Sequence, residues 1–407
     1  MSRSWIDRAL DAIPGGSSTS AKSPVKRLEI DSPAVFAVSG EGAHFNDQEK
    51  RRWLDIDMGM GSVVWGHGRR EIADAIGRQA AVGTNLSAPS TLEILLAERL
   101  LERYQQFDQI RFCKDGSDAT SAAVRAARAA TGRDGVVLGT YHGWHDWSLC
   151  HPLRGSASGG GIPRPIASGL HWLPAESFDS LMEIVPPLPT PPAAVILCPE
   201  HWRPAELSQA RRWCDKMGCL LIFDEVKSSL RYGKSGVAGA LTLKPDLLCI
   251  GKGLANGLPL AAVMGDRALM GHLEEVGFSS THSGESISLA AALAAEALLS
   301  EQSVWPSWGA HSERMMTELG AVLKRFGLVG ELEVTGYPGA FAVESLNPKE
   351  RDAFRRYFNQ GMSAHGIYSL GWVVMSHAHR EREADAILEA CVELLGEYRA
   401  TKERERG

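Results

Sequence analysis

The sequence lacks any uninterrupted apolar run of about 20 residues, the length that a membrane-spanning helix needs. Its N-terminus, MSRSWIDRALDAIPGG, also lacks the apolar core of a secretory signal peptide. We therefore expect a cytoplasmic protein that has no membrane segment.

Cysteine pairs are absent as well. None of the 7 cysteines has a partner at the C-x-x-C spacing that is typical of zinc and redox sites. Three of them, Cys113, Cys198 and Cys249, lie in apolar runs that read as strands. We expect reduced, buried thiols rather than disulfides.

The sequence also has no large excess of charge of one sign. It contains 43 Lys and Arg and 49 Asp and Glu, which gives a net charge of -6. This balance gives no electrostatic drive toward nucleic acid or an anionic membrane, and no basic helix-turn-helix segment is visible. No internal repeat stands out. With 407 residues, 44% of them hydrophobic, the chain can bury a large core, and we expect two domains and a small-molecule partner.

From residue 82 to 265 the sequence alternates helical patterns with short apolar runs, as in a mostly parallel sheet covered by helices. Residues 117–132, SDATSAAVRAARAATG, favour a helix that stops at glycine. The fold class predicted is therefore α/β. The candidate strands are residues 109–113, 135–139, 193–198, 219–223 and 247–251.

A smaller α+β domain is predicted from both ends of the chain. Residues 34–45 read as a hairpin after a short helix, and two short strands are expected near residues 332–336 and 339–344. The boundaries predicted are residues 1–55 for the N-terminal part of the small domain, 56–290 for the large domain and 291–407 for the C-terminal part.

A lysine stands among glycines and small apolar residues in GKGLANGLP, where it serves neither solubility nor a core. This is Lys252, and Asp224 follows the apolar run of the preceding strand. The carboxyl ends of parallel strands are where ligands bind, so both side chains are expected to open onto one crevice. A simple ion pair between them is the alternative.

Two further segments are expected at the same edge. Gly116, Ser117 and Asp118 lie where a strand gives way to a helix, which suits a phosphate, although Ser and Asp are also ordinary caps. Tyr141 and His142 follow the next strand, where an aromatic ring can stack on a flat ligand. A metal site made of His142, His145 and His151 is the alternative, which we do not adopt because no other ligand has a suitable spacing.

An amine, an acid, a phosphate cradle and an aromatic ring together describe pyridoxal 5'-phosphate as the ligand. The motifs resemble class III aminotransferases of the fold-type I pyridoxal-phosphate superfamily, most closely the glutamate-1-semialdehyde aminomutase branch. The segments that carry the resemblance are DGSDA, TGRDGVVLGTYHGWHD, LIFDEV, PDLLCIGKGLANGLPLAAVMG and STHSGESISLAAA.

The resemblance implies a role for each matching residue. Lys252 forms the internal aldimine and moves the proton, and Asp224 pairs with the ring nitrogen. Val226 and Tyr141 pack on the two ring faces, beside His142. The phosphate contacts implied are Gly116, Ser117, Asp118 and, from the other subunit of a homodimer, Thr281.

The departures from the family concern the substrate. Lys26 in SPVK stands where the aminomutase has a carboxylate-binding arginine, and Met60 falls about where it has a tryptophan. CPEHW replaces a Glu-Pro-Val motif and offers Glu200 or His201 to the cofactor or substrate. Several departures resemble aminotransferases of aminoglycoside and surface-polysaccharide pathways.

We therefore expect an enzyme that transfers an amino group, by ping-pong chemistry, from an amino donor to an aldehyde or ketone of a sugar, aminocyclitol or similar molecule. An isomerase, either an aminomutase or an amine epimerase, would use the same lysine. A cofactor-binding regulator without turnover is a third alternative.

Overall fold

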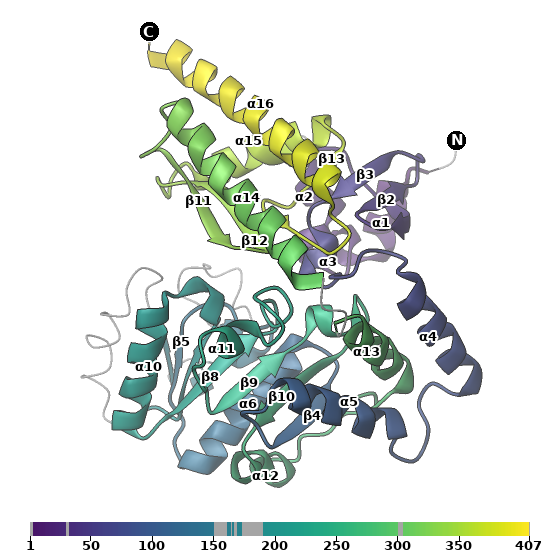
Figure 1. Cartoon of the computed structure of the whole chain (residues 1–407), viewed down its shortest axis with the longest axis vertical. Coiled ribbons are helices and arrows are strands. Elements are labelled where there is room, and N and C mark those ends of the chain that lie inside the picture. The colour runs from purple at the N-terminus through teal and green to yellow at the C-terminus, as the bar shows by residue number, and fades with distance from the viewer. Residues whose placement is uncertain are drawn as a thin grey trace. The chain divides into compact units, whose positions relative to one another are not determined.

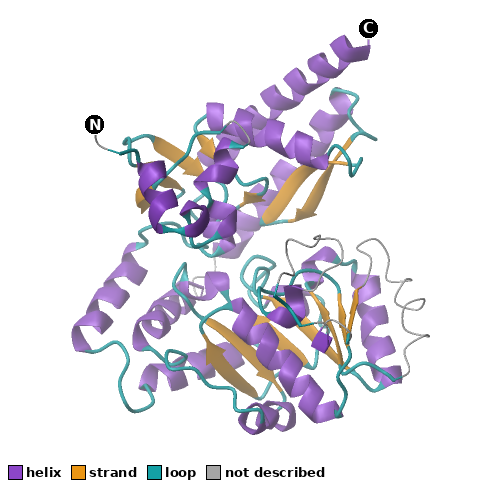
Figure 2. Cartoon of the chain, turned by 180° about the vertical axis from the view of Figure 1, so that it is seen from behind, coloured by secondary structure: helices purple, strands orange, loops and turns teal. Residues whose placement is uncertain are grey.

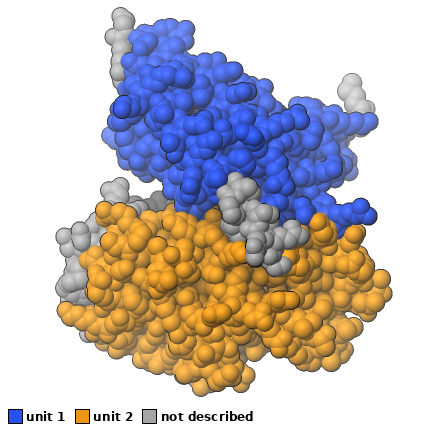
Figure 3. Space-filling view, viewed as in Figure 1, with its two compact units in different colours: residues 1–70, 302–407 blue, residues 71–301 orange. Residues whose placement is uncertain are grey.

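The computed structural model describes residues 3–29, 32–149, 161–163, 165–166, 169–172, 190–299 and 304–406. His151 lies outside the described residues. The chain forms two compact units, residues 1–70 with 302–407, and residues 71–301 (Figure 3). None of the described helices combines the length and apolarity that crossing a bilayer requires.

Unit 2 is built on a seven-stranded sheet in the order β4-β10-β9-β8-β7-β5-β6 (Figure 1). Strands β6, β5, β7, β8 and β9 are mutually parallel, whereas β10 runs antiparallel to both β9 and β4. The strands are β4 (Gln109–Cys113), β5 (Val136–Leu138), β6 (Leu170–Trp172), β7 (Ala194–Leu197), β8 (Leu220–Glu225), β9 (Leu247–Ile250) and β10 (Ala261–Gly265).

Helices flank this sheet (Figure 2), and the burial of each residue shows that the strands β5, β7, β9 and β10 are buried along their whole length. Such strands read as continuous apolar runs because both of their faces are covered. The mostly parallel α/β sheet is confirmed. The helices of this unit are α4 (Arg70–Val82), which begins at the last residue of unit 1, α5 (Thr91–Arg103), α6 (Gly116–Thr131), α7 (Asp146–Leu149), α10 (Pro204–Met217), α11 (Gly236–Ala240), α12 (Arg267–Glu275) and α13 (Ser286–Leu299).

Helix α6 packs its small residues on the sheet. Ala119, Ala123 and Ala127 are fully buried and share a core with strand residues of β5, β7 and β9. The helix ends at Gly132, which has a left-handed conformation with φ 65° that glycine adopts at little cost. The predicted helix with its glycine stop is confirmed.

Unit 1 joins the two ends of the chain through strand pairing. Strand β13 runs parallel to β3, with Ile367 paired to Leu54, and the predicted hairpin is confirmed as β1 and β2. Its strands are β1 (Ala37–Glu41), β2 (His44–Asp47), β3 (Arg52–Asp55), β11 (Leu332–Tyr337), β12 (Ala340–Ser345), β13 (Ile367–Tyr368) and β14 (Val373–Val374). Its helices are α1 (Trp5–Ala12), α2 (Pro24–Leu28), α3 (Met58–Gly61), α14 (Val304–Arg325), α15 (Arg351–Ala364) and α16 (Glu381–Arg406).

The units divide at residues 70/71 and 301/302, whereas the sequence placed the boundaries at 55/56 and 290/291. Two contacts account for the difference. Helix α3 follows β3 and contacts β14 inside unit 1, and α13 packs against α5 inside unit 2.

Candidate active site

The parallel strands of unit 2 end at one edge of the sheet, where α/β proteins bind ligands. The register of β7 and β8 places Cys198 beside Asp224. Asp224 pairs in turn with Cys249 of β9, three residues before Lys252. The predicted acid and amine therefore follow neighbouring strands.

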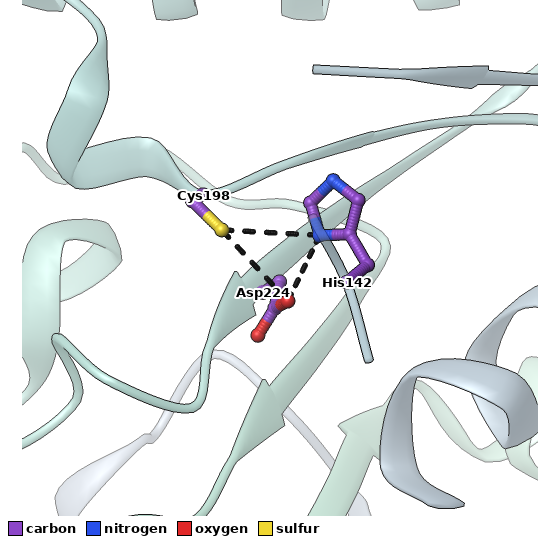
Figure 4. A group of neighbouring side chains, drawn as sticks. All are labelled: His142, Cys198 and Asp224. Atoms are coloured by element: carbon purple, nitrogen blue, oxygen red, sulfur yellow. Dashed lines mark hydrogen bonds and ion pairs between the residues drawn. The ribbon is translucent and has the colours of Figure 1, made fainter. Parts of the chain in front are cut away.

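Asp224 is buried and held by an imidazole. His142 Nδ1 lies 2.8 Å from Asp224 Oδ2 (Figure 4), and the Val226 backbone N–H donates to Oδ1 over 3.2 Å. The ion pair between Asp224 and Lys252 that the sequence left open is absent from the described part of the chain. Asp224 instead has a fixed orientation set by His142 and its own turn.

Three contacts position His142. The Ser148 hydroxyl accepts its backbone N–H, Thr120 donates to its carbonyl, and the Thr140 backbone N–H lies 3.4 Å from Nε2. Since Nε2 accepts there, we assign the ring proton to Nδ1, which donates to Asp224.

Cys198 completes this group. Its sequence position predicted a buried strand residue and did not predict a place in this site. Its Sγ lies 3.8 Å from both His142 Nδ1 and Asp224 Oδ2 (Figure 4). Burial, and then the neighbouring Asp224, raises the pKa of the Cys198 thiol well above its usual range, so the thiol is neutral. An apolar-looking cysteine at the end of a strand gives no signal in the sequence beyond its position.

His142, Cys198 and Asp224 are also the only cluster of three potential metal ligands within the described ranges. His145, a second histidine of the alternative metal site, is not part of this cluster. His145 Nδ1 instead lies 2.7 Å from the Ser121 hydroxyl. With its Nδ1 proton donated to Asp224, His142 acts as a hydrogen-bond donor in this group.

Glycines bring the backbone close around this group. A Cβ at Gly116 would lie 2.7 Å from Val226 Cγ1, and one at Gly251 would lie 3.3 Å from it. A Cβ at Gly143, which has φ +118°, would lie 2.7 Å from Ser117 Oγ. A side chain at any of the three would fill the space around Val226 and Ser117.

The start of α6 is capped by its own chain. Asp115 accepts the backbone N–H groups of Ser117 and Asp118 at 2.7 and 3.0 Å, and the Asp118 carboxylate accepts those of Lys114 and Asp115. The Ser117 hydroxyl accepts the backbone N–H of Trp144 at 3.2 Å. The ordinary capping function that the sequence allowed for this turn is therefore present.

Lys252 stands in a strained backbone conformation, with φ 45°. This left-handed region costs a non-glycine residue about 1 kcal/mol or more. Its half-buried side chain makes no hydrogen bond or ion pair with the rest of the described chain. Tyr141 lies 44% exposed just before His142. The lysine amine is thus held at the strand end without an internal partner.

A second lysine, Lys227, adjoins the first and was also missed from the sequence. Lys227 lies two residues beyond β8, as Lys252 lies two residues beyond β9, and their charges interact. Burial, and then the charge of Lys252, lowers the pKa of Lys227 to about 8. A lysine three residues after Asp224, close behind the apolar run of β8, was the available signal.

Glu225 anchors the loop that follows β8. Its carboxylate accepts the backbone N–H groups of Val237 and Ala238 at 2.7 and 2.8 Å and the Ser228 hydroxyl at 3.1 Å. Burial raises the pKa of Glu225 to about 8, against the lowering effect of these hydrogen bonds.

The remaining candidates of unit 2 differ in exposure. Glu200 lies in the 3-10 turn Pro199–His201 and is only 9% exposed, and its Oε2 has no hydrogen-bond partner among the described residues. His201 is exposed. Thr281 is exposed as well, and its carbonyl accepts from the Asn85 side chain over 3.2 Å.

Lys26 and Met60 belong to unit 1. Lys26 is exposed and its Nζ donates to the Ser20 hydroxyl over 2.7 Å, and Met60 is 37% exposed with φ 59°. The adjacent Arg27 is buried, donates to the Ser369 carbonyl and stacks over the Tyr368 ring. Arg27 therefore holds unit 1 together.

Residues 27–156 and 200–391 match the sequence profile described as Aminotransferase class-III. The chain belongs to this family. It is 31% identical over 423 residues to the glutamate-1-semialdehyde 2,1-aminomutase of Thermus thermophilus, an alignment that covers 96% of this chain and 98% of that protein.

Solved structures of transaminases agree with this assignment. A transaminase with bound PLP has a TM-score of 0.86 and 26% identity, over 98% of this chain and 97% of that one. An omega-transaminase from Sphaerobacter thermophilus has a TM-score of 0.85 and 26% identity, over 96% of each chain. The protein is thus a class III aminotransferase of fold-type I, and its cofactor is pyridoxal phosphate.

The site residues fit this cofactor. A buried carboxylate oriented by an imidazole suits a protonated ring nitrogen, and an amine without an internal partner suits a covalent link to an aldehyde. The glycines around Val226 leave space where side chains would otherwise stand.

Proposed function

We propose that this aminotransferase moves an amino group from an amino acid donor to an aldehyde or ketone carbon of a sugar, an aminocyclitol or a similar hydroxylated molecule. When bound, pyridoxal phosphate supplies an aldehyde that captures amines and a ring that stabilises negative charge on carbon. The two substrates would react in turn at one site.

Lys252 is the proposed catalytic base and the covalent anchor of the cofactor. Its lack of an internal partner and its place two residues beyond β9 support this role. Its amine would take a proton from the donor carbon and return it one position away. Asp224 would face the ring nitrogen, and Val226 and Tyr141 would contact the ring faces. These roles are tested by Lys252→Ala and Asp224→Asn.

The phosphate is assigned to the turn at the start of α6. Gly116 would let the phosphate approach closely, and Ser117 would donate its hydroxyl, while Asp118 holds the turn by its capping bonds. Thr281 would contact the phosphate of the second subunit in a homodimer, which its exposure in the single chain allows. Sedimentation with and without cofactor tests this assembly.

The unpaired Oε2 of Glu200 is the observation on which the proposed hydroxylated acceptor rests. A buried carboxylate oxygen without a donor is unfavourable, and a substrate hydroxyl would satisfy it. The exposed His201 is the neighbouring candidate. Lys26 Nζ donates to the Ser20 hydroxyl and Arg27 donates to the Ser369 carbonyl, so both cations are already bonded within unit 1.

A deoxy series tests this choice. We expect the wild type to prefer a hydroxylated aldehyde over the analogue that lacks one hydroxyl by about 10- to 100-fold in kcat/KM. Glu200→Gln should reduce this preference, whereas the exposed control Glu274→Gln should leave it unchanged. Equal rates for both aldehydes in the wild type would remove the argument for a hydroxylated acceptor.

The first half reaction tests amino transfer itself. Glutamate or another amino donor should change the absorbance of the bound cofactor in the absence of any acceptor. If every donor leaves the spectrum unchanged, ordinary transamination is wrong.

An aminomutase or amine epimerase is the second candidate, which the 31% identity to an aminomutase favours. It would use Lys252 in the same way but keep both carbons in one molecule. Solvent deuterium entering a single substrate without release of a keto acid would identify it.

A further inference from the structure

The hydrogen bonds of Asp224 leave one acceptor position open. An ionised carboxylate accepts about four hydrogen bonds, two on each oxygen. On Oδ2, His142 Nδ1 lies at 2.8 Å and Cys198 Sγ at 3.8 Å (Figure 4). On Oδ1, Val226 N–H takes one position at 3.2 Å. One position on Oδ1 remains.

The thiol of Cys198 fills the second acceptor position on Asp224 Oδ2. Cys198 follows Leu197 of β7, which pairs with Phe223 of β8, and its Sγ lies 3.8 Å from Asp224 Oδ2. A neutral thiol donates a weak S–H hydrogen bond at such sulfur-to-oxygen distances. It therefore fills an acceptor position without adding a second negative charge next to Asp224.

We propose that Cys198 is a positioning residue that acts through Asp224: its thiol occupies Oδ2, so that Oδ1 alone is left to receive the ring N–H of pyridoxal phosphate. This inference rests on the proposed role of Asp224. A weak donor at Oδ2 also leaves the carboxylate a strong acceptor at Oδ1. Replacing the Cys198 thiol by a stronger donor, or by a side chain without a donor, therefore changes how strongly Asp224 Oδ1 accepts the ring N–H.

Three variants test this role. Cys198→Val keeps the approximate volume and removes the donor, and Cys198→Ser restores a donor. Cys214→Ala is the control, because it removes a buried thiol from α10, away from the group of His142, Cys198 and Asp224. For each holoenzyme we would measure the pH dependence of the cofactor absorbance, the dissociation constant of pyridoxal phosphate, and the rate of the first half reaction.

We expect Cys198→Val to weaken cofactor binding by about three- to tenfold, to shift the pH dependence of the absorbance, and to slow the half reaction more than it raises KM for the donor. Cys198→Ser should recover part of each loss, and Cys214→Ala should match the wild type. A Cys198→Val enzyme with wild-type spectra and affinity overturns the inference. So does a Cys198→Ser enzyme as impaired as Cys198→Val, since that result indicates packing alone. If Cys198→Val does not fold, Cys198→Ala takes its place.

Asp224→Asn separates this inference from the proposed function. If Asp224→Asn keeps the spectrum and half reaction of the wild type, the role proposed for Asp224 fails. If Asp224→Asn loses both and Cys198→Val loses neither, only the role of Cys198 fails.

Discussion

Replacing Lys227 by Met should stabilise the cofactor-free enzyme at pH 7. Burial next to Lys252 lowers the pKa of Lys227 from 10.5 to about 8. Each pKa unit corresponds to about 1.4 kcal/mol, so keeping this ammonium charged in the folded state costs about 3 kcal/mol near neutral pH. Met has a similar length and no charge, and removes most of that cost.

The sign of the pH dependence follows from the direction of the shift. Between pH 8 and 10.5 the unfolded chain binds the Lys227 proton more than the folded one does, so wild-type stability rises with pH in this window. The advantage of Lys227→Met should therefore shrink from about 3 kcal/mol at pH 7 to below about 1 kcal/mol at pH 10.5.

Urea unfolding of both proteins at pH 7, 8, 9 and 10, without cofactor, measures this difference. The control is Lys216→Met on α10, which replaces an exposed lysine and should give no difference that depends on pH. A Lys227→Met gain that is equal at pH 7 and pH 10, or a loss of stability at pH 7, would refute the reasoning. We expect Lys227→Met to lower turnover even as it stabilises the fold, because the charges of Lys227 and Lys252, the proposed catalytic base, interact.

Three other changes have expected outcomes. Lys252→Ala should abolish the absorbance of the covalently held cofactor and all turnover while the circular dichroism stays that of the wild type; a fully active variant would contradict its role. Gly143→Ala should weaken cofactor binding about tenfold or more, since the new Cβ would lie 2.7 Å from Ser117 Oγ, whereas Gly132→Ala, with open space around it, should only destabilise the chain. Glu225, whose raised pKa of about 8 exceeds the ordinary 4.5, contributes stability that is present below pH 4.5 and lost as pH rises through about 8. Glu225→Gln should flatten that slope in urea unfolding between pH 5 and 8, and an unchanged slope would count against it.

The strand ends could be predicted from the sequence because apolar runs and the residues that follow them are local signals. Asp224 and Lys252 each follow such a run, and parallel pairing brings the ends of runs together whatever the details of packing. The helix at residues 117–132 could be predicted for the same reason, because its alanines and its terminal glycine are also local signals.

The missed features depend on tertiary contacts. Lys227 resembles an ordinary surface lysine in DEVKSS, and only the folded chain partly buries it and brings its charge near that of Lys252. In the sequence Cys198 resembles any other apolar strand residue. Its place next to Asp224 results from the pairing of β7 with β8. Strand β10 was not predicted because AAVMG has little of the β-branched character of strands, and its place between β4 and β9 comes from packing alone.

The parallel pairing of β13 with β3 bears on how the chain folds as it is made. Leu54 emerges from the ribosome early and Ile367 late, with all of unit 2 between them. Unit 2 is one continuous segment whose strands find partners within it, so it can fold as soon as it is synthesised. In unit 1, strand β3 has no β13 to pair with until the C-terminal part of the chain is made. Closing a loop over so long a segment is also slow. We expect nascent chains that stop before β13 to carry a protease-resistant unit 2 and a protease-sensitive N-terminus.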